Sequence, residues 1–419
     1  MERIPAQLFL APVSQRQKTE DSSVALDCLS DDGKVVMYDA KSVYALWTAK
    51  SYESSTVTFI ASSNASYNIT DIYVLTESAT STPSYSVSVD SVTGGTVTSS
   101  ATKAKESETV TLTVSSDSSS KAAYRIADLT VTDENGAPVE LTNNYDGTYT
   151  FTMPASSVTV TPVFEESGFR YFYVNGIKIQ DVLDYTVNCG SGTAVFDPTT
   201  NTLTLTDATI TTFLGNSSTY PSGIYVSALS TSAVPDGLTI EIVGDNYITG
   251  DGGSKGYCVY SSNVSTNVVG VDGGTLTLSN TVYGFNFATS SVSYTISDCT
   301  ITATSLTNGT ISASGTTTIS DSTITVSDSE RGIYATGALT IDGCVITMDC
   351  TATSAYGGIY STNTNSTGLT IIDSNITLSS GTGYNSLYAR ILTVSGGSTV
   401  IANGGYSTTK TTGNITLSL

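Results

Sequence analysis

The sequence predicts an all-β protein, and three observations lead to that prediction. Strand-forming Thr, Val, Ile and Tyr are frequent, whereas charged residues make up only 13% of the 419 residues. Apolar and polar residues alternate over many short segments, which is the periodicity of a half-buried strand. Related segments also recur along the C-terminal half. We therefore expect an N-terminal β-rich docking region over 1–80, a small β-sandwich over 85–166 and a parallel β-helix over 171–419.

The composition excludes several classes of function. The chain has no histidine, so it offers neither a Ser-His-Asp triad nor a histidine zinc ligand. Its 16 basic and 37 acidic residues give a net charge of −21, and the basic residues are dispersed, so we expect no nucleic-acid partner. No apolar run approaches the roughly 18 residues of a membrane span, so no membrane insertion is expected.

The six cysteines are too few for a disulfide framework in a chain of 419 residues, and no Cys-x-x-Cys pair is present. We therefore expect buried free thiols, no metal site and no cofactor. Cys299 and Cys344 fall on alternate copies of a repeat described below. Two strand spacings, ~9.6 Å, would separate them, which is beyond the reach of a disulfide.

The docking region is predicted from its unpatterned apolar sequence and its aromatic residues. It contains Phe9 and the only tryptophan, Trp47. Because interfaces favour aromatic anchors, we expect these two residues to contact a virion or cell-surface scaffold. Pro5 and Pro12 interrupt the first apolar stretch, which is unlike a secretion signal. Either a signal has been removed from this chain, or the protein reaches the outside as part of a virion.

The β-sandwich is predicted from clean alternation, as in Thr109-Val-Thr-Leu-Thr-Val114, and from the hairpin turns Asp133-Glu-Asn-Gly136 and Asn144-Tyr-Asp-Gly147. Together with Asp146-Gly-Thr-Tyr-Thr-Phe-Thr-Met-Pro-Ala155, this segment resembles the divergent internalin-type B-repeat, an Ig-like module of Gram-positive surface proteins. The resemblance implies a spacer or adhesion module without catalytic residues. Ala122-Ala-Tyr-Arg125 departs from the family, which usually has a Gly-aromatic pair there.

The β-helix is predicted from an internal repeat. Segments of the type Ile-Ser-Asp-Cys-Thr-Ile-Thr begin at Ile296, Ile319, Ile341 and Ile371, at spacings of 23, 22 and 30 residues. A period of this length with several short strands is typical of a solenoid, in which equivalent residues stack on successive turns. The segment resembles the right-handed parallel β-helix repeats of pectate lyases, phage tailspikes and bacterial adhesins.

Within the repeat, three kinds of position are expected to have distinct roles. Small residues should form an interior stack, the aspartates should form turns by bonding their own backbone, and tyrosines following Gly-Ile should project outward. Calcium binding at the turns remains an alternative role for the aspartates. The positions are Cys299, Ser322, Cys344 and Ser374 for the stack, Asp298, Asp321 and Asp373 for the turns, and Tyr225, Tyr334 and Tyr360 for the outward ladder.

Two sets of residues are candidates for a functional site. Asp328, Glu330 and Arg331 concentrate charge on one turn, where they could act as acid, base and substrate clamp, or could simply form a solvated turn. The outward tyrosines could bind sugar rings, or could only stabilise the solenoid by stacking on one another.

Three functions are compatible with these features. The first is a non-enzymatic attachment protein of a bacteriophage virion, such as a head fibre, capsid decoration or tail fibre, that binds glycans. The second is a Gram-positive cell-surface adhesin, and the third is a polysaccharide lyase or glycoside hydrolase. The sequence also allows a homo-oligomer.

Overall fold

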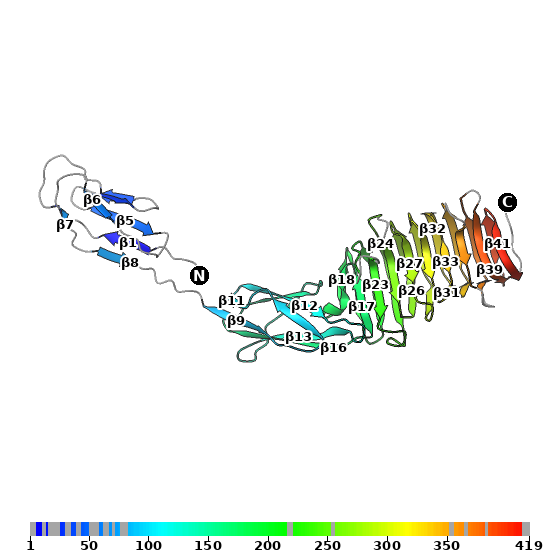
Figure 1. The fold of residues 1–419 in the computed structure, drawn as a ribbon, viewed down its shortest axis with the longest axis horizontal. Coiled ribbons are helices and arrows are strands. Elements are labelled where there is room, and N and C mark those ends of the chain that lie inside the picture. Colours follow the sequence, from blue (N-terminus) through cyan, green and yellow to red (C-terminus); the bar gives the residue numbers. More distant parts are fainter. Residues whose placement is uncertain are drawn as a thin grey trace. The chain divides into compact units, whose positions relative to one another are not determined.

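The computed structural model of the chain consists almost entirely of β-strands, which confirms the all-β prediction. Two compact units are present, Met1–Pro83 and Ser84–Leu419, and both are drawn in Figure 1. In the part of the chain that the structure describes, no helix is long and apolar enough to cross a membrane. The structure describes residues 83–215, 221–252, 256–351, 356–363, 368–381 and 384–412, together with the strands of residues 1–82. For those early strands, for Tyr356 and for residues 406–412 it describes only the backbone.

In the first unit, four strands pair antiparallel in the order β4-β5-β1-β8, and two further pairs join β2 to β7 and β3 to β6. Trp47 lies opposite Leu8, and Phe9 lies opposite Leu46, so the two predicted anchors belong to adjacent central strands of one sheet. Their side chains lie outside the described part of the structure. The strands are β1 (Ala6–Leu10), β2 (Ser14–Gln15), β3 (Leu26–Leu29), β4 (Val35–Tyr38), β5 (Val43–Ala49), β6 (Thr58–Ala61), β7 (Tyr67–Asn68) and β8 (Ile72–Leu75).

The second unit begins with two four-stranded sheets, β10-β12-β15-β14 and β11-β9-β16-β13, which share one apolar core. The alternating sequence produces this core: Val110, Leu112 and Val114 of β12 are buried, and the threonines between them are not. Gly136 and Gly147 occupy the predicted turns with φ of 79° and 83°, which glycine adopts without strain. The strands are β9 (Ser84–Val89), β10 (Gly95–Ser99), β11 (Lys103–Lys105), β12 (Thr109–Ser116), β13 (Tyr124–Asp133), β14 (Thr142–Asn143), β15 (Thr148–Thr152) and β16 (Val158–Glu166).

A parallel β-solenoid of about six turns occupies residues 238–403, which confirms the prediction of a parallel β-helix there. Its turns are the stack of strands that runs from β24 toward β41 in Figure 1. Strands of successive turns pair in three parallel ladders, which we call ladders 1, 2 and 3.

Ladder 1 contains β23 (Ser222–Ala228), β25 (Tyr257–Ser262), β27 (Tyr283–Phe287), β30 (Gly309–Ala313), β33 (Ile333–Ala335) and β36 (Tyr356–Ser361). Ladder 2 contains β21 (Thr202–Thr206), β28 (Ser293–Ser297), β31 (Thr316–Ser320), β34 (Leu339–Asp342) and β37 (Leu369–Ile372). Ladder 3 contains β22 (Thr209–Ile210), β29 (Thr300–Thr304), β32 (Thr323–Ser329), β35 (Val345–Cys350), β38 (Asn375–Ser379) and β40 (Thr399–Asn403). Four long strands each belong to two ladders. The strands β24 (Leu238–Thr249) and β26 (Thr266–Ser279) belong to ladders 2 and 3. The strands β39 (Asn385–Ser395) and β41 (Tyr406–Thr412) belong to ladders 1 and 2.

Antiparallel strands precede the parallel turns. β17 pairs antiparallel with β23, and β20 pairs antiparallel with β21, so the predicted parallel region does not begin at 171. The end of a solenoid leaves strand edges and core side chains without a neighbouring turn, and a differently built terminal segment covers them. This cap contains β17 (Phe169–Val174), β18 (Ile177–Lys178), the 3-10 helix η1 (Ile179–Asp181), β19 (Thr186–Cys189) and β20 (Gly192–Asp197).

The solenoid core repeats the same residue types turn after turn. Ile296, Ile319, Ile341 and Ile371 pair in register along ladder 2, and all four are fully buried. The predicted interior stack of small residues is also present, and Cys299, Ser322, Cys344 and Ser374 are at most 3% exposed. The serine hydroxyls accept hydrogen bonds from the backbone of the preceding turn, as from the Cys299 N–H to Ser322 Oγ at 3.2 Å and from the Cys344 N–H to Ser374 Oγ at 3.0 Å.

The repeat aspartates lie at a sharp corner of each turn. Asp298, Asp321 and Asp373 have φ of 55°, 47° and 43°, a left-handed conformation that Asp tolerates better than most residues. Asp373 Oδ1 also accepts a hydrogen bond of 2.8 Å from the Gly397 N–H of the next turn. These positions therefore form turns, as their sequence pattern predicts, but the hydrogen bond to Asp373 comes from the next turn and not from its own local backbone.

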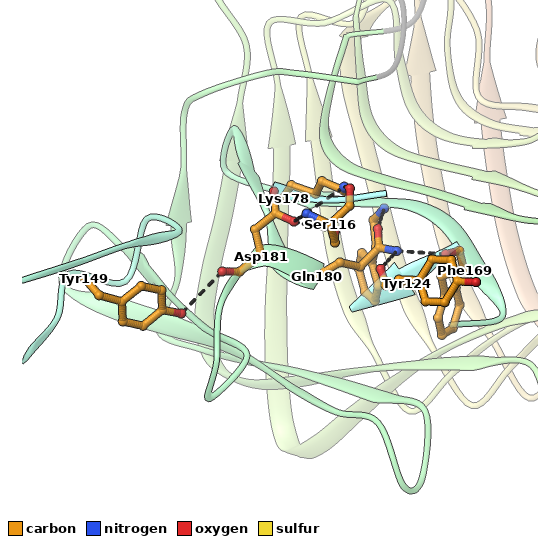
Figure 2. Close-up of polar contacts among 8 residues, drawn as sticks. Ser116, Tyr124, Tyr149, Phe169, Lys178, Gln180 and Asp181 are labelled. Atoms are coloured by element: carbon orange, nitrogen blue, oxygen red, sulfur yellow. Dashed lines mark hydrogen bonds and ion pairs between the residues drawn. The ribbon is translucent and has the colours of Figure 1, made fainter. Parts of the chain in front are cut away.

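The sandwich and the solenoid cap meet through a partly charged, largely buried contact (Figure 2). Asp181 Oδ1 accepts hydrogen bonds from both the backbone N–H and the hydroxyl of Ser116, and it lies 3.5 Å from Lys178 Nζ. Lys178 Nζ in turn donates to the Ser116 carbonyl oxygen. Burial raises the pKa of Asp181, and Lys178 and Ser116 partly offset that rise. Asp181 is thus paired with the ammonium group of a cap residue, Lys178, and hydrogen-bonded by a sandwich residue, Ser116.

Gln180 makes a second, uncharged connection at the same junction (Figure 2). Its amide nitrogen donates to the carbonyl oxygens of Tyr124, at 3.2 Å, and of Phe169, at 2.9 Å. Tyr149 adds a third connection, because its hydroxyl accepts from the Leu183 N–H at 2.6 Å. Each of these bonds except the one to Phe169 joins the sandwich to the cap, so the contact fixes the end of β12, β13 and β15 against η1.

Candidate functional site: the tyrosine column of ladder 1

One position of ladder 1 carries tyrosine on most of its strands, and we call it the tyrosine column. Its side chains alternate with core residues such as Ile333 and Ala335, so they point away from the core. The parallel register places the column residues one above the other on successive turns. They are Tyr225, Tyr260, Asn286, Ser312, Tyr334, Tyr360 and Tyr388.

Neighbouring tyrosines of the column stack on one another. The rings of Tyr225 and Tyr260 are nearly parallel, with centroids 5.0 Å apart and an interplanar angle of 13°. Tyr334 and Tyr360 have centroids 5.4 Å apart at 26°, and Tyr360 and Tyr388 have centroids 4.8 Å apart at 47°. These distances follow the spacing of adjacent strands, ~4.8 Å, so the solenoid backbone sets the stacking.

The three tyrosines predicted to project outward differ in exposure. Tyr334 and Tyr360 are half-buried, but Tyr225 is only 4% exposed. Tyr173 of the cap meets the Tyr225 ring edge-on at 6.2 Å, and Tyr260 covers one of its faces. Burial accordingly raises the pKa of the Tyr225 hydroxyl. Tyr225 therefore belongs to the packed beginning of the column and offers no open ring face to a ligand.

A second pair of tyrosines lies beside the column. Tyr257 and Tyr283 pair in register on β25 and β27, and their rings are parallel within 4° at 5.7 Å. Burial raises the pKa of Tyr283, and the nearby Arg331 opposes that rise. Tyr283 thus connects the tyrosine column to the charged turn that precedes β33.

The charged turn before β33 contains Glu330 and Arg331, whereas Asp328, which the sequence predicts on the same turn, lies within β32. Arg331 Nη2 lies 3.5 Å from Glu330 Oε1, so these two residues form an ion pair. Asp328 has a left-handed backbone with φ of 49°, and it lies where the register between β32 and β35 shifts. Asp328 and Glu330 both line one open pocket of about 420 Å³, together with Ser305, Leu306, Thr307 and Thr351.

The carboxylates of Asp328 and Glu330 and the threonine and serine hydroxyls lining this pocket can accept hydrogen bonds from the hydroxyl groups of a ligand. In the described ranges, no group of three or more Cys, Asp or Glu residues could hold a metal ion.

The cysteines of the solenoid are buried and free, and burial suppresses their reactivity. Burial raises the pKa of Cys258, Cys299 and Cys350 to about 12 each. A thiol is nucleophilic only as a thiolate, which such a pKa makes rare at neutral pH. These residues therefore serve the core and not a reaction.

Sequence reasoning found part of the column and missed the rest. Tyr260 and Tyr388 occupy the same register as Tyr334, but Cys258-Val and Ser386-Leu precede them in place of Gly-Ile. A search for a small residue followed by an aliphatic residue and tyrosine finds both, because the first of the three positions is buried and requires only that its side chain be small.

Comparison of the chain with protein-family models, with curated proteins and with solved structures returns no match.

Proposed function

We propose that this chain is a non-enzymatic attachment protein exposed on a bacteriophage virion, and that its solenoid adheres to glycans. In this proposal the N-terminal unit docks on the particle and residues 85–166 act as an Ig-like spacer of the B-repeat type. The single observation that carries the proposal is the tyrosine column, whose half-buried rings at Tyr334 and Tyr360 lie on the outer side of ladder 1.

Physical chemistry supports a carbohydrate as the ligand of this column. Sugar rings have an apolar face that packs on aromatic rings, and their hydroxyls need hydrogen-bond acceptors nearby. The pocket lined by Asp328 and Glu330 offers such acceptors close to the column. Repeated turns would also present the same aromatic position several times, which raises avidity for a repeating polysaccharide.

Two alternatives have their own support. The resemblance of residues 85–166 to B-repeats favours a secreted Gram-positive adhesin, in which the N-terminal unit would contact a cell-surface scaffold. A polysaccharide-degrading enzyme is favoured by one observation, the two carboxylates lining one pocket. That enzyme should release sugar fragments and should lose about 10²-fold or more of its activity in Glu330→Gln.

The glycan-binding part of the proposal is tested by retention on immobilised cell-wall glycans. We expect the double variant Tyr334→Ala/Tyr360→Ala to bind at least tenfold more weakly, since each lost stacking contact contributes ~1 kcal/mol. Tyr247→Ala is the matched control, because Tyr247 is 45% exposed on β24, outside ladder 1. Equal retention of all three proteins would contradict glycan binding by the column.

The docking part is tested by deleting residues 1–80. We expect a soluble, folded remainder, because Ser84–Leu419 forms a compact unit with its own cores. The truncated protein should no longer incorporate into its parent particle. Full incorporation would refute the assembly role of Phe9 and Trp47, and incorporation into a cell wall by the intact chain would favour the adhesin.

A further inference from the structure

The tyrosine column is interrupted at its centre. Asn286 and Ser312 occupy, on two consecutive turns, the position that holds Tyr260 on one side and Tyr334 on the other. We call Asn286 and Ser312 the polar interruption. The backbone register is continuous across it, so the side chains change while the scaffold does not.

The polar interruption leaves one aromatic face uncovered by other rings. Within the described residues, the only ring stacked on Tyr334 is that of Tyr360, which lies on the following turn. The opposite face of Tyr334 is directed toward Ser312, whose side chain is too short to cover a phenol ring. A flat ligand can therefore replace the missing ring against Tyr334.

The side chains of the interruption can also form hydrogen bonds. Both Asn286 and Ser312 are half-buried, and the hydrogen bonds of the described residues include none from either side chain. The Asn286 amide offers two donor hydrogens and an acceptor oxygen, and the Ser312 hydroxyl offers both functions. A ligand with several hydroxyl groups matches this set.

The dimensions fit one sugar ring. Tyr260 and Tyr334 are separated by three strand spacings, ~14 Å. Aromatic contacts of ~4 Å at each end leave ~6 Å, which is enough for one pyranose and its substituents but not for a globular partner. Tyr283 borders the same region, since its hydroxyl interacts electrostatically with both Tyr334 and Arg331.

The charges around the interruption select among sugars. Asp328 and Glu330 of the adjoining pocket outnumber Arg331, and the whole chain carries a net charge of −21. An anionic sugar would meet repulsion from both sources, whereas neutral hydroxyls can donate to the carboxylates. The surroundings therefore favour an uncharged pyranose.

We propose that the polar interruption is a subsite for one neutral pyranose, stacked on the free face of Tyr334 and hydrogen-bonded by Asn286 and Ser312. This inference rests on the proposed glycan-binding function and assigns its centre. The carboxylates of the neighbouring pocket extend the subsite and accept hydrogen bonds from the next sugar unit.

Filling the interruption tests the proposal, because a new ring takes the place of the sugar and replaces one side chain that would bond to it. In Ser312→Tyr and Asn286→Tyr, the new ring continues a column that already holds tyrosine on several turns, so both variants should fold as the parent chain does. Saturation-transfer difference NMR with neutral and uronic-acid oligosaccharides should show at least tenfold weaker binding of neutral sugars by both variants. Thr323→Tyr is the control, because Thr323 is exposed on ladder 3 and its replacement adds a tyrosine elsewhere.

Each outcome decides between the subsite and the wider function. Undiminished binding by Ser312→Tyr, with binding still lost in Tyr334→Ala/Tyr360→Ala, would overturn the subsite and leave the proposed function standing. Preferential binding of uronic acids would overturn the assignment of a neutral sugar. Absence of any glycan binding by the parent chain would overturn both proposals, and circular dichroism with a thermal melt excludes misfolding as the cause of a loss.

Discussion

The sandwich and the solenoid bury similar alternating strands, but they connect them differently. In the sandwich, β13 and β16 are distant in the sequence but pair from Asp133 opposite Val158 to Tyr124 opposite Glu166, and the strands of 84–166 share one core. In the solenoid, each strand pairs with its equivalents on the turns before and after it. The sandwich should therefore unfold as one cooperative unit, whereas the solenoid should behave as a chain of nearest-neighbour turns.

The largest expected effect tests this difference directly. Leu112 in the sandwich and Ile341 in the solenoid are both fully buried, so replacing either by alanine should lower the free energy of unfolding by about 3 kcal/mol. Hydrogen exchange should separate them: Leu112→Ala should weaken protection throughout 84–166, and Ile341→Ala mainly in the turns next to β34. Uniform loss of protection in Ile341→Ala would contradict the nearest-neighbour description.

The second prediction concerns the junction between the two regions. Lys178→Met removes the cation beside the buried Asp181 and should destabilise the unit by about 2 kcal/mol at neutral pH. The pKa of Asp181 is already raised by burial and rises further in the variant, so protonation favours the folded state. The stability deficit should therefore be large at neutral pH and shrink as the pH falls toward ~4. Thermal melts between these pH values measure it, and a deficit that grows on acidification would show that Asp181 is not the partner.

The third prediction is a smaller effect, confined to the solenoid turns. Asp321→Gly should change the free energy of unfolding by less than about 0.5 kcal/mol, because Gly343 occupies the same corner on the next turn with φ of 65°. Asp321→Val should cost about 1–2 kcal/mol, because a β-branched residue resists this left-handed conformation. Equal stability of the two variants in urea titrations would show that backbone conformation does not limit residue choice at this corner.

The last prediction uses thiols as a local probe. All cysteines after residue 83 lie in the cap or the solenoid, and none lies in the sandwich. With pKa values raised to about 12 by burial, Cys258, Cys299 and Cys350 should not react with a thiol reagent in the native state. In a Cys28→Ser background, labelling should begin only when the solenoid opens, whether or not the sandwich remains folded. Rapid labelling at neutral pH and low temperature would contradict this burial.

The sequence alone determined the features that depend on neighbouring residues. Alternation of Thr and Ile predicts strands, and the recurrence of Ile296, Ile319 and Ile341 predicts their alignment, because equivalent residues of a solenoid must stack. The same argument predicts the interior position of Ser322 and the turn role of Asp321.

The tertiary structure decided what depends on residues far apart in the chain. Tyr225 has the same local sequence as Tyr334, yet the cap covers it, and only the packed structure brings Tyr173 against it. The register that aligns Ser312 with the tyrosines passes through turns of unequal length, so spacing in the sequence does not reveal it. Local alternation fixes which side of a strand a residue occupies, but the contacts between turns and with the cap fix what it meets there.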